Sequence, residues 1–204
     1  MITYNVNHPK GMRPKMNLSV VRVEPSTWRD LNIHQHHYLT EDLNPSCKCL
    51  LFLWDGTPIG FVGIINQPSK GNPWGFRISR IVVFPDYQGL GFSSDMLKFC
   101  GEIIKNYGET AQLYIKTVHK KMGKHLEKSP NWNPTAYNGK YRKDPNDEGG
   151  KYRNRLERIS YCYRYDGTKR EGYEELLLSI GDLRKKKKKE SKCKVPTLFD
   201  DLKD

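Results

Sequence analysis

Apolar residues recur along the chain at two spacings. Alternating or continuous apolar runs are typical of strands. They predict strands in five segments: residues 18–25, 47–67, 76–84, 111–118 and 157–167. The second of these segments holds Asp55-Gly56 between two apolar runs, which predicts a hairpin with a tight turn at that pair.

Between these strands, apolar residues recur every three or four positions, which is the period of an amphipathic helix. The clearest apolar stripe lies in residues 94–108 and consists of Met96, Leu97, Cys100, Ile103 and Ile104. Three further helices are predicted in residues 25–39, 119–129 and 171–181. Up to the last predicted strand, at residues 157–167, the order is therefore strand, helix, three strands, helix, strand, helix, strand.

The composition changes toward both ends of the chain. Hydrophobic residues make up 36% of the 204 residues, a low share that indicates solvated segments beside one core. We expect an N-terminal arm at residues 1–18, a folded domain at 19–170, and a C-terminal helix and basic tail at 171–204. Within the domain, residues 131–154 are rich in Asn, Gly, Pro, Tyr and Lys and predict a long loop.

The formal net charge of +12 favours a polyanionic partner, most often nucleic acid, over a role in solubility alone. The five cysteines include no CxxC pair, which argues against a disulfide framework and a four-cysteine zinc site. No apolar run has the length of a membrane span, and the N-terminus has no signal-peptide core. We therefore expect a cytoplasmic protein of a bacterial or phage-infected cell.

Residues 80–100, RIVVFPDYQGLGFSSDMLKFC, join a predicted strand to a predicted helix through a glycine-rich turn. Backbone amides at a helix start favour an anion, and glycines let the anion approach closely. Ser93 and Ser94 are candidates to cap the helix or to donate hydroxyl hydrogen bonds. The segment has neither the GxxxxGK[ST] nor the GxGxxG spacing. A plain strand–helix turn is the alternative interpretation.

The stretch VVFPDYQGLGFSSDML resembles the pyrophosphate-binding segment of the GNAT acetyltransferase superfamily, Gln/Arg-x-x-Gly-x-Gly/Ala. Gln88, Gly91 and Ser93 occupy its fixed positions, with Ser93 in place of Gly/Ala. The resemblance covers about residues 19–165. It implies a mixed α/β fold with a central, mostly antiparallel sheet flanked by helices, and acetyl-CoA as cofactor. It assigns the pantetheine arm to the strand before the turn and the pyrophosphate to the turn, at Ile81, Val82, Val83, Gln88, Gly89, Leu90, Gly91, Phe92, Ser93 and Ser94.

Amine acetylation needs a base for the ammonium proton and an acid for the leaving thiolate. Many family members have a glutamate on the strand before the turn and a tyrosine on a later helix, but RISRIVV and HKKMGKHLEKS contain neither. The substitute candidates are His37 and Tyr38, in the HQHHYL stretch, and His119 after the YIKTV strand. The alternative interpretations are structural histidines near residue 37 and a helix cap at His119.

The chain also resembles the Mom family, which is named after the DNA-modification protein of phage Mu. The resemblance lies in the HHY element, the glycine-rich turn, the SPNW stretch and the basic tail. That resemblance implies modification of adenine in DNA and a requirement for iron. His37 is the candidate metal ligand, with Asp86, Asp166 or Tyr163 as partners, although no ligand spacing supports a metal.

Chemistry on a DNA base requires that the base leaves the stack and meets aromatic and basic side chains. The predicted loop supplies a candidate DNA surface at Trp132, Tyr141, Arg142, Lys143, Arg153 and Arg155, with lysines 185–189 adding non-specific attraction. A polar loop without that role is the alternative. Near the C-terminus, Leu198-Phe199 lies among acidic residues and is a candidate docking motif for a partner protein.

Three functions therefore stay open: an acetyl-CoA-dependent transferase acting on adenine in DNA, an ordinary N-acetyltransferase for a protein or small amine, and a DNA-binding protein of the same fold without turnover.

Overall fold

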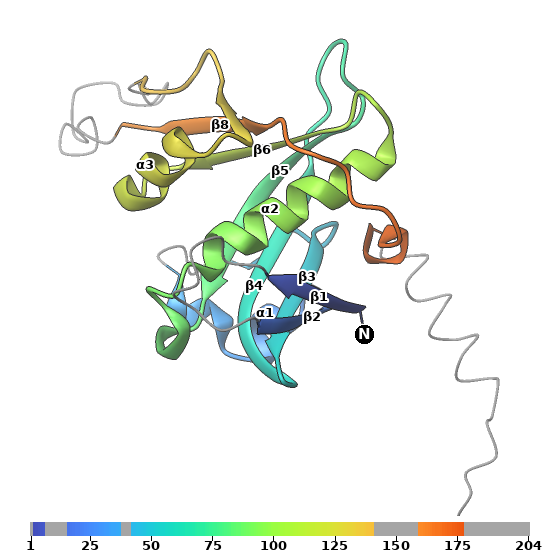
Figure 1. Ribbon diagram of the computed structural model, residues 1–204, viewed down its shortest axis with the longest axis vertical. Coiled ribbons are helices and arrows are strands. Elements are labelled where there is room, and N and C mark those ends of the chain that lie inside the picture. The colour runs from blue at the N-terminus through green and yellow to red at the C-terminus, as the bar shows by residue number, and fades with distance from the viewer. Residues whose placement is uncertain (1, 7–15, 38–41, 141–158, 178–204) are drawn as a thin grey trace, which may run out of the picture.

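The computed structural model describes residues 2–6, 16–37, 42–140 and 159–177 (Figure 1). In this part of the chain, eight strands form one sheet in the order β1-β2-β3-β4-β5-β6-β8-β7. The strands are β1 (Ile2–Val6), β2 (Met16–Val23), β3 (Lys48–Trp54), β4 (Thr57–Asn66), β5 (Gly75–Val83), β6 (Gln112–Thr117), β7 (Trp132–Pro134) and β8 (Tyr161–Tyr165). Every neighbouring pair is antiparallel except β5 and β6, which are parallel.

The α-helices are α1 (Thr27–Asp30), α2 (Phe92–Ile104) and α3 (Lys120–Lys128). Short 3₁₀ turns are η1 (Ile33–His36), η2 (Pro85–Tyr87), η3 (Lys105–Tyr107) and η5 (Glu174–Leu177). This arrangement confirms the mixed α/β fold with a mostly antiparallel sheet. None of the described helices combines the length and the apolar character of a membrane span.

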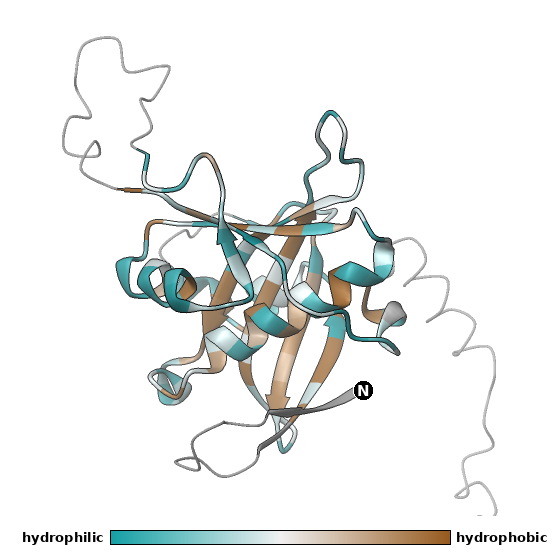
Figure 2. Cartoon of the chain, turned by 45° about the horizontal axis from the view of Figure 1, so that its top comes forward, coloured by the Kyte–Doolittle hydropathy of each residue, from teal (hydrophilic) through white to brown (hydrophobic). Residues whose placement is uncertain are grey.

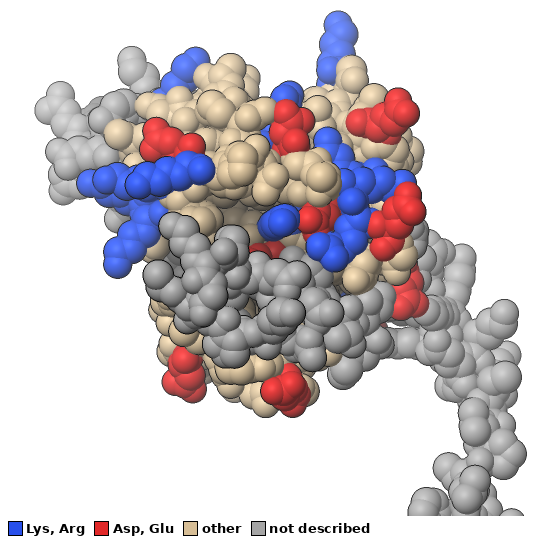
Figure 3. Space-filling view, viewed as in Figure 1, with Lys and Arg blue, Asp and Glu red and all other residues tan. Residues whose placement is uncertain are grey.

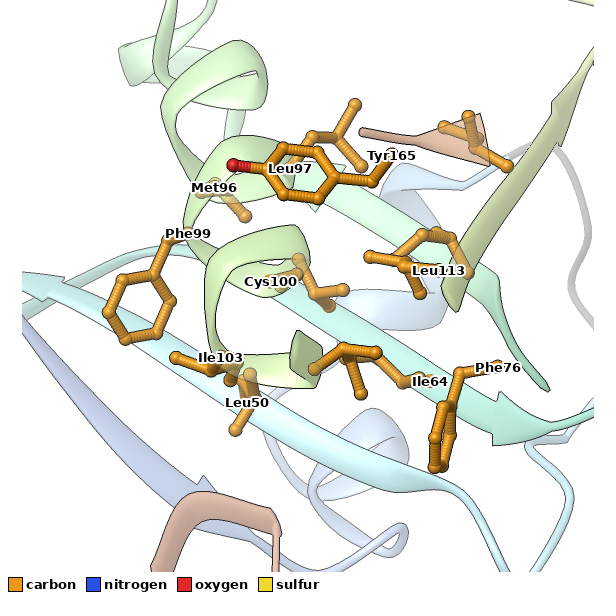
Figure 4. Close-up of a cluster of buried hydrophobic side chains, with 14 of the residues drawn as sticks. Leu50, Ile64, Phe76, Met96, Leu97, Phe99, Cys100, Ile103, Leu113 and Tyr165 are labelled. Atoms are coloured by element: carbon orange, nitrogen blue, oxygen red, sulfur yellow. The ribbon is translucent and has the colours of Figure 1, made fainter. Parts of the chain in front are cut away.

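The central strands are buried on both faces, which explains their nearly continuous apolar runs. Leu50 and Phe52 of β3 face a core cluster that α2 covers, while Cys49 and Leu51 face a second cluster around Trp28 of α1. Figure 2 shows the apolar colour concentrated on these strands. Figure 4 shows the α2 side of the sheet, where helix side chains interdigitate with those of the strands.

Two glycines let the helices lie directly against the aromatic side chains of β8. An added Cβ at Gly101 of α2 would lie 2.3 Å from the Tyr165 ring, and one at Gly123 of α3 would lie 2.2 Å from the Tyr161 ring. Both helices therefore cover the same face of the sheet, since Tyr161 and Tyr165 are four residues apart on one strand.

Most predicted elements appear where the sequence places them, and four differ. One is β7, which lies in the segment predicted as a long loop. Residues 2–6, predicted as part of an arm, form β1 and pair with β2. The helix predicted at residues 25–39 is split into α1 and η1, because Asn32 has a left-handed backbone with φ of 53°. The C-terminal helix is represented in the described part by η5 alone, whose Leu176 and Leu177 are buried.

Candidate active site

Strands β5 and β6 pair over only three residues and then separate. The ladder joins Gly75–Arg77 to residues 112–114, yet β5 continues to Val83 and β6 to Thr117. Figure 1 shows the two strands running apart beyond this point. An unpaired strand edge is a ready template for another chain or an extended ligand. The fork, defined here as residues 78–83 of β5 and 115–117 of β6, presents such edges in the middle of the sheet.

A β-bulge lies at the start of the fork. Gly63 of β4 pairs with Arg80 and the next residue pairs with Ile78, so Ser79 is the extra residue on β5. Bulges re-aim the side chains that follow them and are frequent beside active sites.

The glycine-rich turn begins where β5 ends. The chain passes through η2 and then through Gly89 and Gly91, whose φ values are 81° and 86°. Only glycine adopts such angles without strain. The Gln88 side chain folds back and its Nε2 donates to the Val83 carbonyl oxygen at 3.0 Å, which links the turn to the strand.

Helix α2 begins at Phe92 with Gly91 as its N-cap, and no side chain caps it. Ser93 and Ser94 therefore lie inside the first turn and are not caps, and the Ser94 amide donates to the Gly91 carbonyl oxygen at 3.0 Å. The side chain of Phe92 is buried against Trp54 and Tyr87. The turn consequently offers backbone amides and the positive end of a 13-residue helix to an anion.

The histidine segment lies against the end of β5. The ring of His36 contacts the Phe84 ring with centroids 5.6 Å apart, and the ring of half-buried His37 contacts that of Trp28 at 5.7 Å. Trp28 belongs to the second core cluster, on the sheet face opposite α2. The structure therefore places His37 on that face, near the strand that leads into the turn, while Tyr38 lies outside the described residues.

Residues 17–123, just over half of the chain, match the acetyltransferase (GNAT) family. The chain belongs to this family. The GNAT family uses acetyl-CoA, so this protein is a GNAT-family acyltransferase. The sequence has no significant match among curated proteins.

Solved GNAT structures share the fold at low sequence identity. Naa50 of Arabidopsis thaliana, solved with a bisubstrate analogue CoA-Ac-MVNAL, has a TM-score of 0.50 and 13% identity, over 74% of this chain and 99% of that chain. The ribosomal-protein-S18-alanine N-acetyltransferase of Escherichia coli has a TM-score of 0.51 and 15% identity, over 75% and 96%. A spermidine N-acetyltransferase chimera of Vibrio cholerae SpeG and hSSAT has a TM-score of 0.51 and 12% identity, over 79% and 99%. The second is named for a ribosomal protein and the third for a polyamine, and the comparisons give no support to the Mom branch.

The residues at the turn fit the GNAT cofactor. Positive φ at both glycines, the absence of a side-chain cap and the exposed helix start leave room and donors for a pyrophosphate. Val82 is buried and Ile81 and Val83 are partly buried against the cores, so these three residues offer backbone and not side chains to a ligand along the fork. The assignment of cofactor contacts to single residues stays a prediction.

His119 occupies a structural position in this GNAT protein. Its Nδ1 accepts a hydrogen bond from the Met122 amide at 3.2 Å, so the ring caps α3. This is the alternative that the sequence left open for His119. His119 is exposed.

No metal site is visible in the described residues: no three His, Cys, Asp or Glu side chains come close enough together to hold an ion. Asp166 accepts a hydrogen bond from Asn133 at 2.6 Å, and Tyr163 is buried and accepts from Asn138 at 3.5 Å. The comparisons give no evidence of iron.

The predicted DNA surface is placed only in part. Trp132 is 5% exposed and packs against Tyr165 in the core, which corrects its prediction as a base-stacking residue on an open loop. It belongs to β7, which pairs with β8. The other predicted contacts, Tyr141, Arg142, Lys143, Arg153 and Arg155, lie outside the described residues, as does the Leu198-Phe199 motif.

Helix α3, which the sequence predicts as a basic helix at residues 119–129, carries a cationic face. At 3.6 residues per turn, its outward residues fall within an arc of about 140°: Lys120, Lys121, Lys124, His125 and Lys128. The opposite side holds Gly123 and Leu126, which are buried. Figure 3 shows basic side chains gathered over α3 at the left of the molecule. The sequence signal for this face is the helical spacing of the basic residues in 120–128.

Proposed function

We propose that this protein transfers the acetyl group of acetyl-CoA to an amine at the fork between β5 and β6. The observation that carries the proposal is the direct succession of fork, glycine turn and uncapped helix start within residues 78–94. The fork accepts an extended arm and the turn accepts a diphosphate, and these are the two parts of coenzyme A that precede its thioester.

The backbone has the main role in cofactor binding. The amides of residues 89–93 donate to the pyrophosphate, helped by the dipole of α2. The edge of β5 that faces the fork, at Ile81–Val83, hydrogen-bonds the amides of the pantetheine arm, as a neighbouring strand would. The thioester then lies toward Arg80 and Ser79, since an extended arm runs back along β5 from the turn.

The transfer conserves atoms and charge. The acceptor ammonium first loses a proton, its nitrogen forms a bond to the acetyl carbon, and the carbon–sulfur bond breaks. The second nitrogen proton ends on the sulfur, which gives coenzyme A and the acetamide. His37 lies on the sheet face opposite α2 and is our candidate for carrying the first proton, because imidazole titrates near neutral pH.

The test is incubation of the purified protein with acetyl-CoA and a panel of acceptors: peptides with free N-termini, a polyamine, a phosphorylated amine and an adenine-containing oligonucleotide. Mass spectrometry should find one added acetyl group on at least one acceptor with the wild type and none with Gly91→Val. Absence of any acetyl adduct together with absence of coenzyme A release would contradict the proposal.

The cationic face of α3 favours a second candidate function, acetyl transfer to an exocyclic amine of a nucleic acid, such as adenine in DNA. Like charges at i and i+4, such as Lys120 with Lys124, destabilise a helix, and lysines in its first turn oppose its dipole. A bound polyanion would neutralise the repulsion between these lysines. Contacts from the lysines to its phosphates would hold a nucleic-acid strand beside the fork.

This candidate has its own test. Changing Lys120, Lys124 and Lys128 to Gln should weaken oligonucleotide binding and reduce its salt dependence, while leaving coenzyme A binding unchanged. The matched control changes Lys98, Lys105 and Lys169 to Gln, which removes the same amount of charge from positions outside α3. If oligonucleotide binding by the two triple variants has the same salt dependence, α3 does not contribute to nucleic-acid recognition.

A further inference from the structure

Two arginines of β5 lie on one face of the sheet at the start of the fork. Phe76, Ile78, Ile81 and Val83 all contact the α2-side core, so the residues between them point to the opposite face. Arg77 is one of these. The bulge at Ser79 shifts the alternation, so Arg80 points to the same face as Arg77 despite a spacing of three.

The contact around Gly63 confirms the direction of Arg80. An added Cβ at Gly63 would lie 2.9 Å from the Cys47 sulfur, in the second core cluster, and 3.8 Å from the Arg80 Cβ. Arg80 therefore lies on the sheet face of Trp28, His37 and the second cluster. Arg77 closes the ladder with β6 and Arg80 follows it, so both flank the place where the strands separate.

Within the described chain, neither guanidinium has a carboxylate partner. Arg80 donates only to the Ser79 carbonyl oxygen, at 3.0 Å, and Arg77 makes no side-chain hydrogen bond there. Both are half-buried, and the Nε of each is enclosed without an acceptor. Arg29, Arg164 and Arg170, by contrast, each pair with a carboxylate.

The neighbouring strands β3, β4 and β6, all within the described residues, contain no carboxylate either. By the alternation of β6, whose Leu113 and Ile115 face α2, Tyr114 and Lys116 share the face of Arg77. From the β3 side Cys47 faces Arg80, and its thiol has a pKa lowered by a hydrogen bond with Cys49 and by Arg22 and Arg80. The face is thus cationic where many GNAT members carry a glutamate.

We propose that Arg77 and Arg80 bind a phosphate group of the acceptor, so that the preferred substrate is an amine that carries phosphate. Two guanidinium groups with free N–H donors match the geometry and the charge of a phosphate. Half-burial strengthens the contact relative to one in open water. The inference rests on the proposed function for the location of the acceptor, and its phosphate contact can be tested separately.

The same charges account for the missing carboxylate base. Nearby cations disfavour a second positive charge, so they lower the pKa of an ammonium bound beside them. The acceptor amine then reaches its neutral, nucleophilic form more readily without a glutamate. A polyamine such as spermidine carries only positive groups and would be repelled from this face.

The binding experiment saturates the protein with coenzyme A, which occupies the turn, and then titrates inorganic phosphate by ³¹P NMR. The wild type should bind phosphate. The double variant Arg77→Met/Arg80→Met should bind phosphate about tenfold or more weakly. The control, Arg29→Met with Arg164→Met, removes the same two charges and should bind as the wild type does. Equal binding by the wild type and the Arg77/Arg80 variant, or none by either, would overturn the inference.

An acceptor comparison then distinguishes the sources of phosphate. Higher kcat/KM for phosphoethanolamine than for ethanolamine, lost in the Arg77/Arg80 variant, indicates a free phosphorylated amine. A preference for an oligonucleotide over its nucleoside, lost in the same variant, indicates a nucleic acid. Spermidine acetylated as well as either one would contradict the inference. Failure of coenzyme A to bind would instead contradict the proposed function, while the difference in phosphate binding between variants still tests the arginines.

Discussion

The imidazole of His119 accepts the Met122 amide and so completes the first turn of α3. We predict that His119→Ala lowers the free energy of unfolding by about 1 kcal/mol, the usual cost of losing an N-cap. His119→Asn should restore most of it, since Asn is a good cap. Chemical denaturation measures both variants. An acetyl-transfer rate that falls a hundredfold in both variants would show instead that the ring acts in the chemistry.

His37 differs from His119 because its ring lies edge-on to buried Trp28, on the sheet face that Arg77 and Arg80 share. We predict that His37→Ala lowers kcat by about a hundredfold, the range for removal of a general base, with unchanged coenzyme A affinity. His36→Ala, which removes a neighbouring ring that contacts Phe84, is the matched control. Normal turnover of the His37 variant would exclude it from proton transfer.

At the scale of elements, α2 depends on a close approach to β8. In a helix interior, Gly→Ala is normally favourable by about 1 kcal/mol. At Gly101 we predict the opposite sign, a loss of roughly 1–3 kcal/mol, because the new Cβ would lie 2.3 Å from the Tyr165 ring. Thermal unfolding measures the change. A raised melting temperature would show that β8 can move away at little cost.

The sequence predicts elements well where local chemistry decides them. The hairpin at Asp55-Gly56 has positive φ at both residues, as a tight turn of that type requires. The glycine turn before α2 was likewise predicted from its residues. The split of α1 and η1 was not, because it depends on a left-handed Asn32, and a single Asn does not specify that conformation.

The candidate site was harder to predict than the elements. The shared face of Arg77 and Arg80 depends on the bulge at Ser79, and a strict period of two would have placed them on opposite faces. The burial of Trp132 depends on the pairing of β7 with β8, which brings distant segments together. Neither feature has a local signal in the sequence.

At the scale of the whole molecule, a buried carboxylate connects the C-terminal segment to α2. Glu102 is 3% exposed and accepts from the Arg170 Nε at 2.6 Å, while the Arg170 amide donates to the Glu102 carbonyl oxygen at 3.2 Å. Asn106 donates to the Arg170 carbonyl oxygen at 2.7 Å. These contacts hold the chain that leads to η5 against the domain.

We predict that Arg170→Met costs about 1–3 kcal/mol of stability, because the Lys98 ammonium, at 3.8 Å, is then the one cation left beside the buried Glu102 carboxylate among the described residues. The double variant Arg170→Met/Glu102→Gln should lose less stability than the sum of the losses in the two single variants. Denaturant unfolding of all four proteins measures the coupling. Strict additivity would show that the pair does not act as a unit.

The central claim is that the glycine turn between β5 and α2 binds coenzyme A. The most direct measurement is calorimetric titration of coenzyme A into the wild type, Gly89→Val, Gly91→Val and Gly56→Val. Gly56 and Gly89 have matching φ values of 82° and 81°, and an added Cβ meets nothing within 4 Å at either. Gly56→Val and Gly89→Val therefore introduce matching backbone strain, and they differ in whether the strained residue lies in the glycine turn. We predict binding by the wild type and the Gly56 variant, and at least a tenfold loss in both turn variants. Equal affinity in all four proteins, or no binding by the wild type, would contradict the account.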